Sequence, residues 1–177
     1  IPKYDPIWAK AQELDVLIFL HPDGFTHGDR LAEHYFINIL GNPLDTTIAV
    51  HHLIFKGVLE RYPDLRILLA HGGGFIAAYP GRIDHAWSAR ADAHSGLPNP
   101  PTSYLKKMYF DTAVYTPHQL RFLVDFYGAD HVVMGTDYPF DMAEFRPVEH
   151  VLETDGLDDA QKAAIISENA HRLLKLR

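Results

Sequence analysis

The chain has 177 residues, no cysteine, and 23 acidic against 16 basic side chains, which gives a formal net charge of −7. The length predicts one domain, 1–177, because domains commonly run to about 100–200 residues. The acidic balance and the lack of a basic run argue against nucleic acid as a partner, and no apolar stretch reaches the roughly 18 residues of a membrane helix. The absence of cysteine excludes a disulfide scaffold, a thiolate zinc finger and a cysteine nucleophile.

Two further features of the sequence bear on chemistry and location. The chain contains 12 histidines, which direct attention to metal binding or acid–base chemistry. It opens on Ile1 without the pattern of a signal peptide, so cytoplasmic location is the default expectation.

The first quarter of the chain predicts a helix, a strand and a second helix. Asp5-Pro6 opens a helix expected at 5–13, since proline is tolerated in the first turn of a helix. The short, continuous apolar run 16–20 predicts a buried strand. A loop and then a helix at 31–40 are expected to follow, ended by Gly41-Asn42-Pro43.

The middle of the chain repeats this alternation. Asp45 is expected to cap a helix that runs to Arg61, and the apolar run 66–70 predicts the second strand. Three glycines and a helical stretch through Ala93 come next. The proline-rich segment 95–101 is expected to be a loop.

The last third predicts two more strands, at 108–110 and 131–135, with a helix at 116–128 between them and helices at 147–154 and 158–176 after them. Strands that alternate with helices of this length pair in parallel through crossover connections. The predicted fold class is therefore α/β. Four such units fit either a small open sheet or half of an eight-stranded barrel, since a complete barrel takes about 250 residues.

An ionisable side chain stands at the end of each predicted strand. His21 follows the first strand, His71 the second, Asp111 ends the third, and Asp137 closes the fourth. The carboxyl ends of parallel strands meet at one edge of the sheet, where α/β proteins place their sites. Two imidazoles and a carboxylate there have the ligand chemistry of Zn²⁺ or another divalent metal.

Each of these residues also has a purely structural interpretation. His21 fits the cap of the turn before Pro22, and His71 fits a similar capping role. Asp137 fits the start of a turn. Asp111 is expected to support the site rather than to bind a metal. Histidines elsewhere in the chain, among them His27, are interpreted as packing or surface residues.

Five motifs of the sequence, taken in order, resemble the amidohydrolase-related metal-dependent decarboxylases, and most of all the group like aminocarboxymuconate semialdehyde decarboxylase. They are His21-Pro22, Gly41-Asn42-Pro43 with Asp45-Thr46-Thr47, His71-Gly72-Gly73-Gly74, Gly81-Arg82-Ile83 and Gly135-Thr136-Asp137-Tyr138-Pro139-Phe140. The resemblance implies a (β/α)₈ TIM-barrel fold, of which this chain is the second half, strands five to eight. It also implies one divalent metal, zinc or in some members manganese.

The resemblance assigns roles residue by residue. It implies that His21 and Asp137 bind the metal and that His71 and Asp137 are catalytic. Arg82 and Phe140 correspond to substrate-binding positions, and the arginine acts across a dimer interface, so a homodimer and a small carboxylic acid substrate are expected. The family's H-x-H ligand pair is missing from this chain. We therefore expect a carboxyl-terminal portion of a longer protein that is inactive alone.

Three functions remain open at this point. The first is decarboxylation of an unsaturated or aromatic carboxylic acid. The second is metal-dependent hydrolysis of a lactone, amide or ester on the same scaffold. The third is a catalytically inactive fragment that serves as a binding or assembly module, since a half-barrel exposes strand edges.

Overall fold

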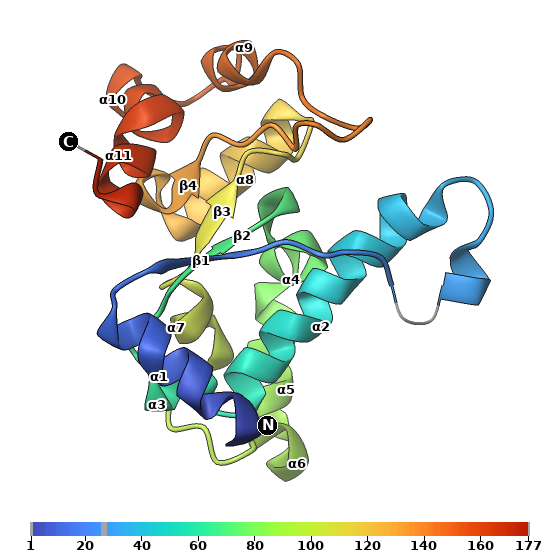
Figure 1. Cartoon of the computed structure of the whole chain (residues 1–177), viewed down its shortest axis with the longest axis vertical. Helices are drawn as coiled ribbons and strands as arrows, with labels where there is room; N and C mark the ends of the chain where they lie inside the picture. Colours follow the sequence, from blue (N-terminus) through green and yellow to red (C-terminus); the bar gives the residue numbers. More distant parts are fainter. Residues whose placement is uncertain (1, 26–27, 177) are drawn as a thin grey trace.

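The computed structural model describes residues 2–25 and 28–176. Within those ranges the strands form one four-stranded parallel sheet in chain order (Figure 1). This confirms the predicted α/β class and the parallel pairing. The strands are β1 Leu17–Leu20, β2 Arg66–Leu69, β3 Tyr109–Asp111 and β4 Val132–Val133.

Helices connect and cover the strands. The α-helices are α1 Asp5–Glu13, α2 Asn42–Phe55, α3 Val58–Arg61, α4 Gly74–Ala78, α5 Pro80–Ala89, α6 Ala91–His94, α7 Pro101–Leu105, α8 Pro117–Tyr127, α9 Pro147–Leu152, α10 Asp159–Ala163 and α11 Asn169–Leu174. Single turns of 3₁₀-helix are η1 Pro2–Tyr4, η2 Gly28–Leu31, η4 His71–Gly73 and η5 Ala129–His131, and π-helical turns are η3 Ile37–Gly41 and η6 Ala164–Glu168. The predictions for α1 and α8 are confirmed.

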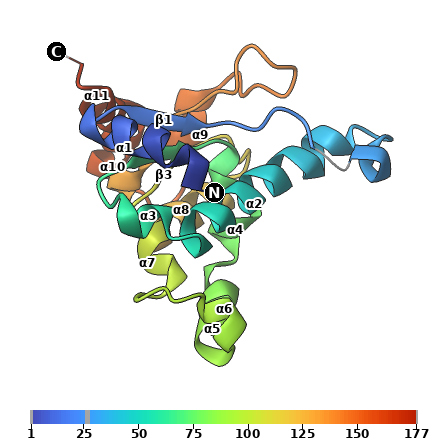
Figure 2. The ribbon, with the colours of Figure 1, turned by 60° about the horizontal axis from the view of Figure 1, so that its bottom comes forward.

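The predicted helix at 31–40 is wrong. That part of the chain holds η2, irregular turns and η3, and it reaches away from the sheet as an arm (Figures 1 and 2). Residues 41–43 do not end a helix either, because η3 runs directly into α2. Gly41 has helical torsions, and Pro43 lies in the first turn of α2, where its missing N–H costs nothing. Asp45 therefore lies inside this first turn instead of capping it.

Other boundaries also differ from the predictions. The strand predicted at 131–135 is reduced to β4, and the helix predicted at 158–176 is divided into α10, η6 and α11. The helix predicted to reach Arg61 breaks at Gly57, whose φ of 67° ends α2 before α3 begins. The helical stretch through Ala93 is divided into α4, α5 and α6, with breaks before Pro80 and at Arg90. The loop at 95–101 ends in α7, a short helix that begins at Pro101.

The core lies where the helices meet the sheet. Ile67, Leu69, Phe110 and Val132 of the strands are at most 1% exposed and join one cluster with apolar side chains of α2 and α8. Burial of each such side chain contributes about 1.5–3 kcal/mol. Asn169 of α11 fixes the last helices to β4, since its amide donates to the backbone oxygens of Ala129 and Val132, both at 2.7 Å.

Both edges of the sheet are open in the described part of the chain. β1 pairs with β2 alone and β4 with β3 alone, and Phe19 of β1 is 54% exposed. The strands thus form an arc and not a closed barrel. Among the described residues, no helix has the length and apolar character needed to cross a membrane.

Candidate metal centre

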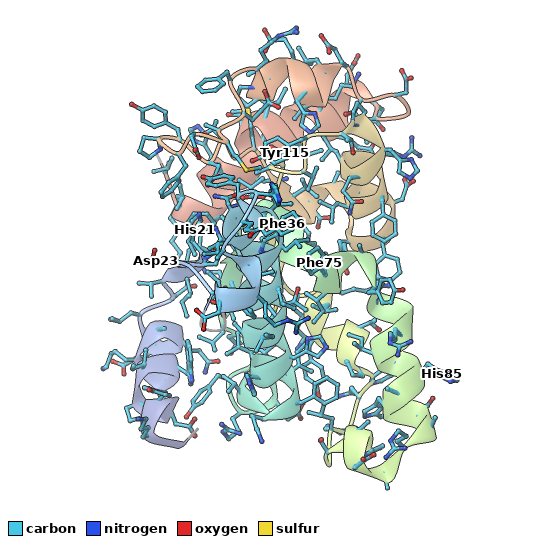
Figure 3. The ribbon with its side chains drawn as sticks, turned by 90° about the vertical axis from the view of Figure 1, so that its right-hand side faces the viewer. His21, Asp23, Phe36, Phe75, His85 and Tyr115 are labelled. Atoms are coloured by element: carbon cyan, nitrogen blue, oxygen red, sulfur yellow. The ribbon has the colours of Figure 1, made fainter. Side chains whose placement is uncertain are left out.

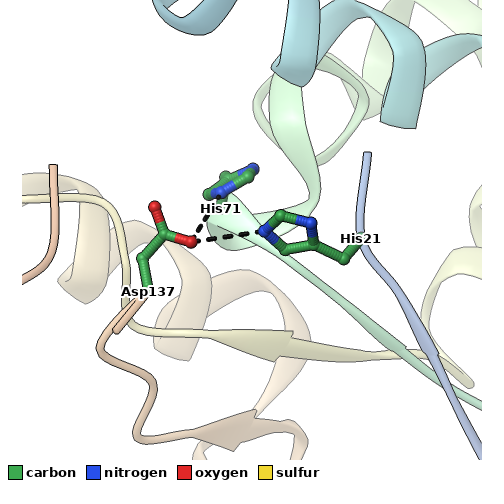
Figure 4. Close-up of side chains that lie close together, drawn as sticks. All are labelled: His21, His71 and Asp137. Atoms are coloured by element: carbon green, nitrogen blue, oxygen red, sulfur yellow. Dashed lines mark hydrogen bonds and ion pairs between the residues drawn. The ribbon is translucent and has the colours of Figure 1, made fainter. Parts of the chain in front are cut away.

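His21, His71 and Asp137 converge at the carboxyl edge of the sheet (Figure 4). The Nε2 atom of His21 lies 3.2 Å from Oδ1 of Asp137, and the Nε2 atom of His71 lies 3.5 Å from the same oxygen. One ligand atom from each of the three residues falls within 4.8 Å of the others. The two imidazole rings meet edge to face, with centroids 5.0 Å apart.

The backbone at the strand ends turns these side chains toward one another. His21 follows β1 directly, whereas His71 and Asp137 have φ angles of 55° and 58°, in the left-handed region that few non-glycine residues adopt. The side chain of Asp137 is only 8% exposed and that of His71 14%. A carboxylate with so little exposed area needs polar partners, and among the described residues the two histidines face it.

The glycines after His71 permit close approach of two helices. Gly74 has a φ of 63°, and a Cβ atom there would overlap the carbonyl oxygen of Pro43. Thr47 of α2 secures the same junction. Its hydroxyl donates to that oxygen at 2.8 Å and accepts from the backbone N–H groups of Phe75 and Ile76 at 3.0 and 3.3 Å. The turn that carries His71 is thereby held between α2 and α4.

Asp111 lies beneath this turn and is 5% exposed. Its Oδ1 atom accepts hydrogen bonds from the N–H groups of Gly72 and Ala113, at 2.8 and 3.1 Å. Burial raises the pKa of the Asp111 carboxyl, against the opposing effect of these hydrogen bonds and of His71. The residue is not one of the three converging donors, which agrees with its expected supporting role.

Two cavities adjoin the three residues. One, of about 370 Å³, is lined by His71 and Asp137 together with apolar side chains and the polar residues Tyr115 and Gln119. The other, of about 330 Å³, is lined by the polar side chains of His21, Asp23, Asn38 and Asn42 and by the ring of Phe140. Sequence reasoning missed Tyr115 and Gln119, although Tyr115 follows β3 and the rule of strand ends points to it. Nothing in the sequence placed Asn38, which comes from the arm.

Phe140 is brought to the site, as the resemblance implies. Its ring stacks on that of His21, with centroids 5.6 Å apart and planes 12° from parallel. The loop that carries it is tied to two other parts of the chain. Tyr35 of the arm donates to Asp141 at 2.6 Å, and Tyr115 donates to the backbone oxygen of Met142 at 2.8 Å.

Arg82 is not brought to the three converging residues. It lies on α5 and lines a separate cavity, of about 360 Å³, that is bounded by α2, α4 and α5. In Figure 3, His85 of that helix lies at the lower right, away from His21 and Tyr115. His51, which belongs to the same cavity, stacks on Phe55 as a packing residue. His27 falls outside the described residues.

The three donors fit a divalent cation. Ligand bonds of about 2.0–2.2 Å place neighbouring ligand atoms of a tetrahedral site roughly 3.3 Å apart, close to the 3.2 and 3.5 Å between Asp137 and the two histidines. Two neutral imidazoles and a carboxylate suit zinc and also manganese. The Nε2 atom of His71 faces Asp137, whereas its buried Nδ1 has no partner among the described residues.

The parallel sheet, with two histidines and an aspartate at its carboxyl edge, has the features of an α/β protein that binds a metal at the ends of its strands. The family model described as "Amidohydrolase" matches residues 2–176, and the chain belongs to that family. It is 33% identical over 177 residues to 2-amino-3-carboxymuconate-6-semialdehyde decarboxylase of Dictyostelium discoideum, covering 99% of this chain and 49% of the relative. It is 27% identical over 184 residues to gamma-resorcylate decarboxylase of Rhodococcus jostii, covering 99% and 55%. The chain thus spans about half the length of the curated relatives it matches.

Solved structures agree with this relationship. A dihydroxybenzoic acid decarboxylase from Polaromonas, with bound manganese and the inhibitor 2-nitroresorcinol, superposes with a TM-score of 0.87 at 25% identity, over 99% of this chain and 55% of that chain. The 5-carboxyvanillate decarboxylase of Sphingomonas paucimobilis gives a TM-score of 0.89 at 22% identity, over 100% and 54%, a likeness of fold alone. The predicted (β/α)₈ TIM-barrel type is confirmed, with this chain as a part of the barrel.

Proposed function

We propose that this chain carries the metal-binding half of a decarboxylase that acts on an unsaturated or aromatic carboxylic acid. The observation that supports this most is the convergence of His21, His71 and Asp137 within 4.8 Å at the carboxyl edge of the sheet. Relatives that match almost the whole chain are named as decarboxylases of such acids. The first half of the barrel, with further ligands, comes from outside these 177 residues.

His21 and Asp137 are proposed to hold the divalent cation, zinc or manganese. When bound, the cation supplies Lewis-acid chemistry, because it stabilises negative charge on substrate oxygens. The near burial of the Asp137 side chain keeps water from competing for its carboxylate. Phe140, stacked on His21, limits how far that imidazole can turn.

His71 is proposed to move the proton. In decarboxylation the bond between the substrate carbon and its carboxylate breaks, CO₂ leaves with neither of the bonding electrons, and the carbon takes up one proton. The His71 ring lines the larger cavity and lies beside Asp137, so an acid at this position reaches a substrate bound there. Asp137 is the second group able to share in that delivery.

The larger cavity suits a small acid. Beside His71 and Asp137, its walls combine apolar side chains with the polar ones of Asn38, Tyr115 and Gln119, and its volume of about 370 Å³ lies in the range of small-molecule sites. Phe140 lines the neighbouring cavity beside His21 and is proposed to contact the substrate from that side. Arg82 is proposed to bind a substrate carboxylate in a second copy of the chain, because its own site is out of reach and a guanidinium binds carboxylate in two-pronged fashion.

The proposal is tested by release of CO₂. The 177-residue chain is assayed alone, and also joined to the amino-terminal half of the Dictyostelium relative, with zinc or manganese and a panel of hydroxybenzoates and carboxymuconate-type acids. We expect CO₂ from the joined protein and none from the chain alone. A product heavier by one water would indicate hydrolysis. Tight association of the two halves without turnover of any panel acid would indicate an assembly module.

The role of Arg82 is tested separately by mixing two inactive variants. Joined proteins that carry Arg82→Ala and Asp137→Ala are denatured together and refolded to form mixed dimers. If the arginine acts in the partner's site, one site of each mixed dimer is complete, and up to about a quarter of the unsubstituted activity returns. No recovery in dimers shown to be mixed would place Arg82 outside the site or within its own.

A further inference from the structure

Asp111 has contacts that the proposed chemistry does not use. It ends β3, is 5% exposed, and accepts the N–H groups of Gly72 and Ala113 at 2.8 and 3.1 Å. It therefore connects the turn after β2 with the turn after β3. The N–H group of Gly72 belongs to the residue next to His71.

The turn after β2 needs such an acceptor. His71 and Gly72 have φ angles of 55° and 58°, and a left-handed residue other than glycine costs roughly 1–2 kcal/mol. Without Asp111 the buried N–H of Gly72 would also lack a partner, at a cost of about 1–3 kcal/mol. Both costs disappear if the turn relaxes, and relaxation would rotate the His71 ring away from Asp137.

The same side chain adjoins the turn after β4. A Cβ atom at Gly135 would come within 2.8 Å of the Asp111 Cβ atom, so the two backbones are packed as closely as glycine allows. Thr112, the next residue, donates to the carbonyl oxygen of Gly135 at 3.3 Å and accepts its N–H at 3.1 Å. Gly135 lies two residues before Asp137.

We propose that Asp111 is a positioning residue that sets the place of His71 relative to Asp137 and so determines how tightly the site binds a metal. The proposal rests on the metal site of the proposed function. Asp111 itself binds neither metal nor substrate. Its action runs through the backbone of Gly72 on one side and through the packing against Gly135 on the other.

The test uses Co²⁺, whose visible absorption reports the ligands around it, titrated into the 177-residue chain and three variants. Asp111→Ala removes the acceptor and is expected to weaken Co²⁺ binding at least about 10-fold. Asp111→Asn keeps a carbonyl oxygen for both N–H groups and is expected to stay within about 3-fold of the unsubstituted chain. Asp125→Asn, an exposed residue of α8 that pairs with Arg121, is the matched control and is expected to leave binding unchanged.

Circular dichroism identifies the folded variants, and only those are compared. Native binding by folded Asp111→Ala would overturn the proposal, and so would equal losses in the Asn and Ala variants, since these would assign the effect to charge.

Amide hydrogen exchange of the unsubstituted chain needs neither a folded variant nor a bound metal. We expect the amides of Gly72 and Ala113 to be protected, and their free exchange in the folded chain would overturn the proposal. Failure of the unsubstituted chain to bind Co²⁺ would count against the metal site of the proposed function, while protected amides would still support the action of Asp111 on the turn.

Discussion

His21 and Asp137 are 116 residues apart in the chain, and their Nε2 and Oδ1 atoms lie 3.2 Å apart. They follow β1 and β4, the two outer strands of the sheet. In a flat sheet those strands would be roughly 14 Å apart, since neighbouring strands are spaced by about 4.8 Å. The contact therefore depends on the curvature of the sheet and on the loop that returns from β4, as expected of strands that belong to a barrel.

The first prediction separates the two histidines. His21→Ala is expected to remove a metal ligand and to lower zinc affinity at least about 10-fold, with activity of the joined protein lost in proportion. His71→Asn is expected to lower CO₂ release at least about 100-fold even at saturating zinc, because general acid–base catalysis contributes about 10²–10⁴-fold. Metal titration and CO₂ assays on both variants provide the comparison. If CO₂ release by His71→Asn recovers at saturating zinc, as expected for His21→Ala, His71 is a metal ligand and not the acid.

The second prediction concerns the junction of α2 and α4. Gly74→Ala is expected to destabilise the chain by more than about 3 kcal/mol, because the new Cβ overlaps the Pro43 carbonyl and the residue has a positive φ. At Gly81, in α5, an added Cβ meets no atom within 4 Å. Gly81→Ala is therefore expected to raise the free energy of unfolding by at most about 1 kcal/mol. Urea denaturation measures both. Equal stabilities would mean that α2 and α4 do not approach as closely as described.

The third prediction concerns the Thr47 hydroxyl. Thr47→Val keeps the shape of the side chain but leaves the Pro43 oxygen and two N–H groups of α4 without this partner. A loss of about 1–3 kcal/mol in the free energy of unfolding is expected. Thr47→Ser retains the hydroxyl and should recover most of that loss. A valine variant as stable as the parent would contradict the arrangement.

The fourth prediction is a pH dependence. Burial raises the pKa of Tyr127, and its hydroxyl donates to the Ala77 oxygen at 2.8 Å. The folded state therefore holds this proton where the unfolded chain, with an ordinary tyrosine pKa near about 10, releases it. Stability is unaffected below about pH 10 and falls above it, at about 1.4 kcal/mol per pH unit for this one group.

Tyr127→Phe removes the ionisable hydroxyl, and with it the loss of stability above about pH 10 that this group causes. Urea unfolding of the parent and the variant at pH 8 and pH 11 is expected to show the phenylalanine variant less stable at pH 8, by about 1 kcal/mol for the lost hydrogen bond, and to show the difference shrink or reverse at pH 11. A difference that is the same at both pH values would mean that Tyr127 ionises at an ordinary pKa when folded.

The strands and the converging residues were predictable because their signals are local. Each strand is a short apolar run, and each of His21, His71 and Asp137 stands just beyond one. The parallel order follows from the alternation with helices, and that order alone places the three side chains at one edge.

The arm before α2 was not predictable, because its pattern is ambiguous. Gly41 and Pro43 commonly end a helix, yet here one has helical torsions and the other lies in the first turn, where proline is equally at home. Local sequence patterns also do not predict where Arg82 lies in the fold. Its sequence position indicates a helix, but the cavity that it lines depends on how α2, α4 and α5 pack together.

The metal site is tested most directly by calorimetric titration of zinc into the purified 177-residue chain. The same titration is carried out on the Asp137→Ala variant. Asp137 is the residue that both histidines face, so the account predicts one zinc ion per chain and an affinity at least about 10-fold lower in the folded variant. The same stoichiometry and affinity in both chains would contradict a metal centre built on His21, His71 and Asp137.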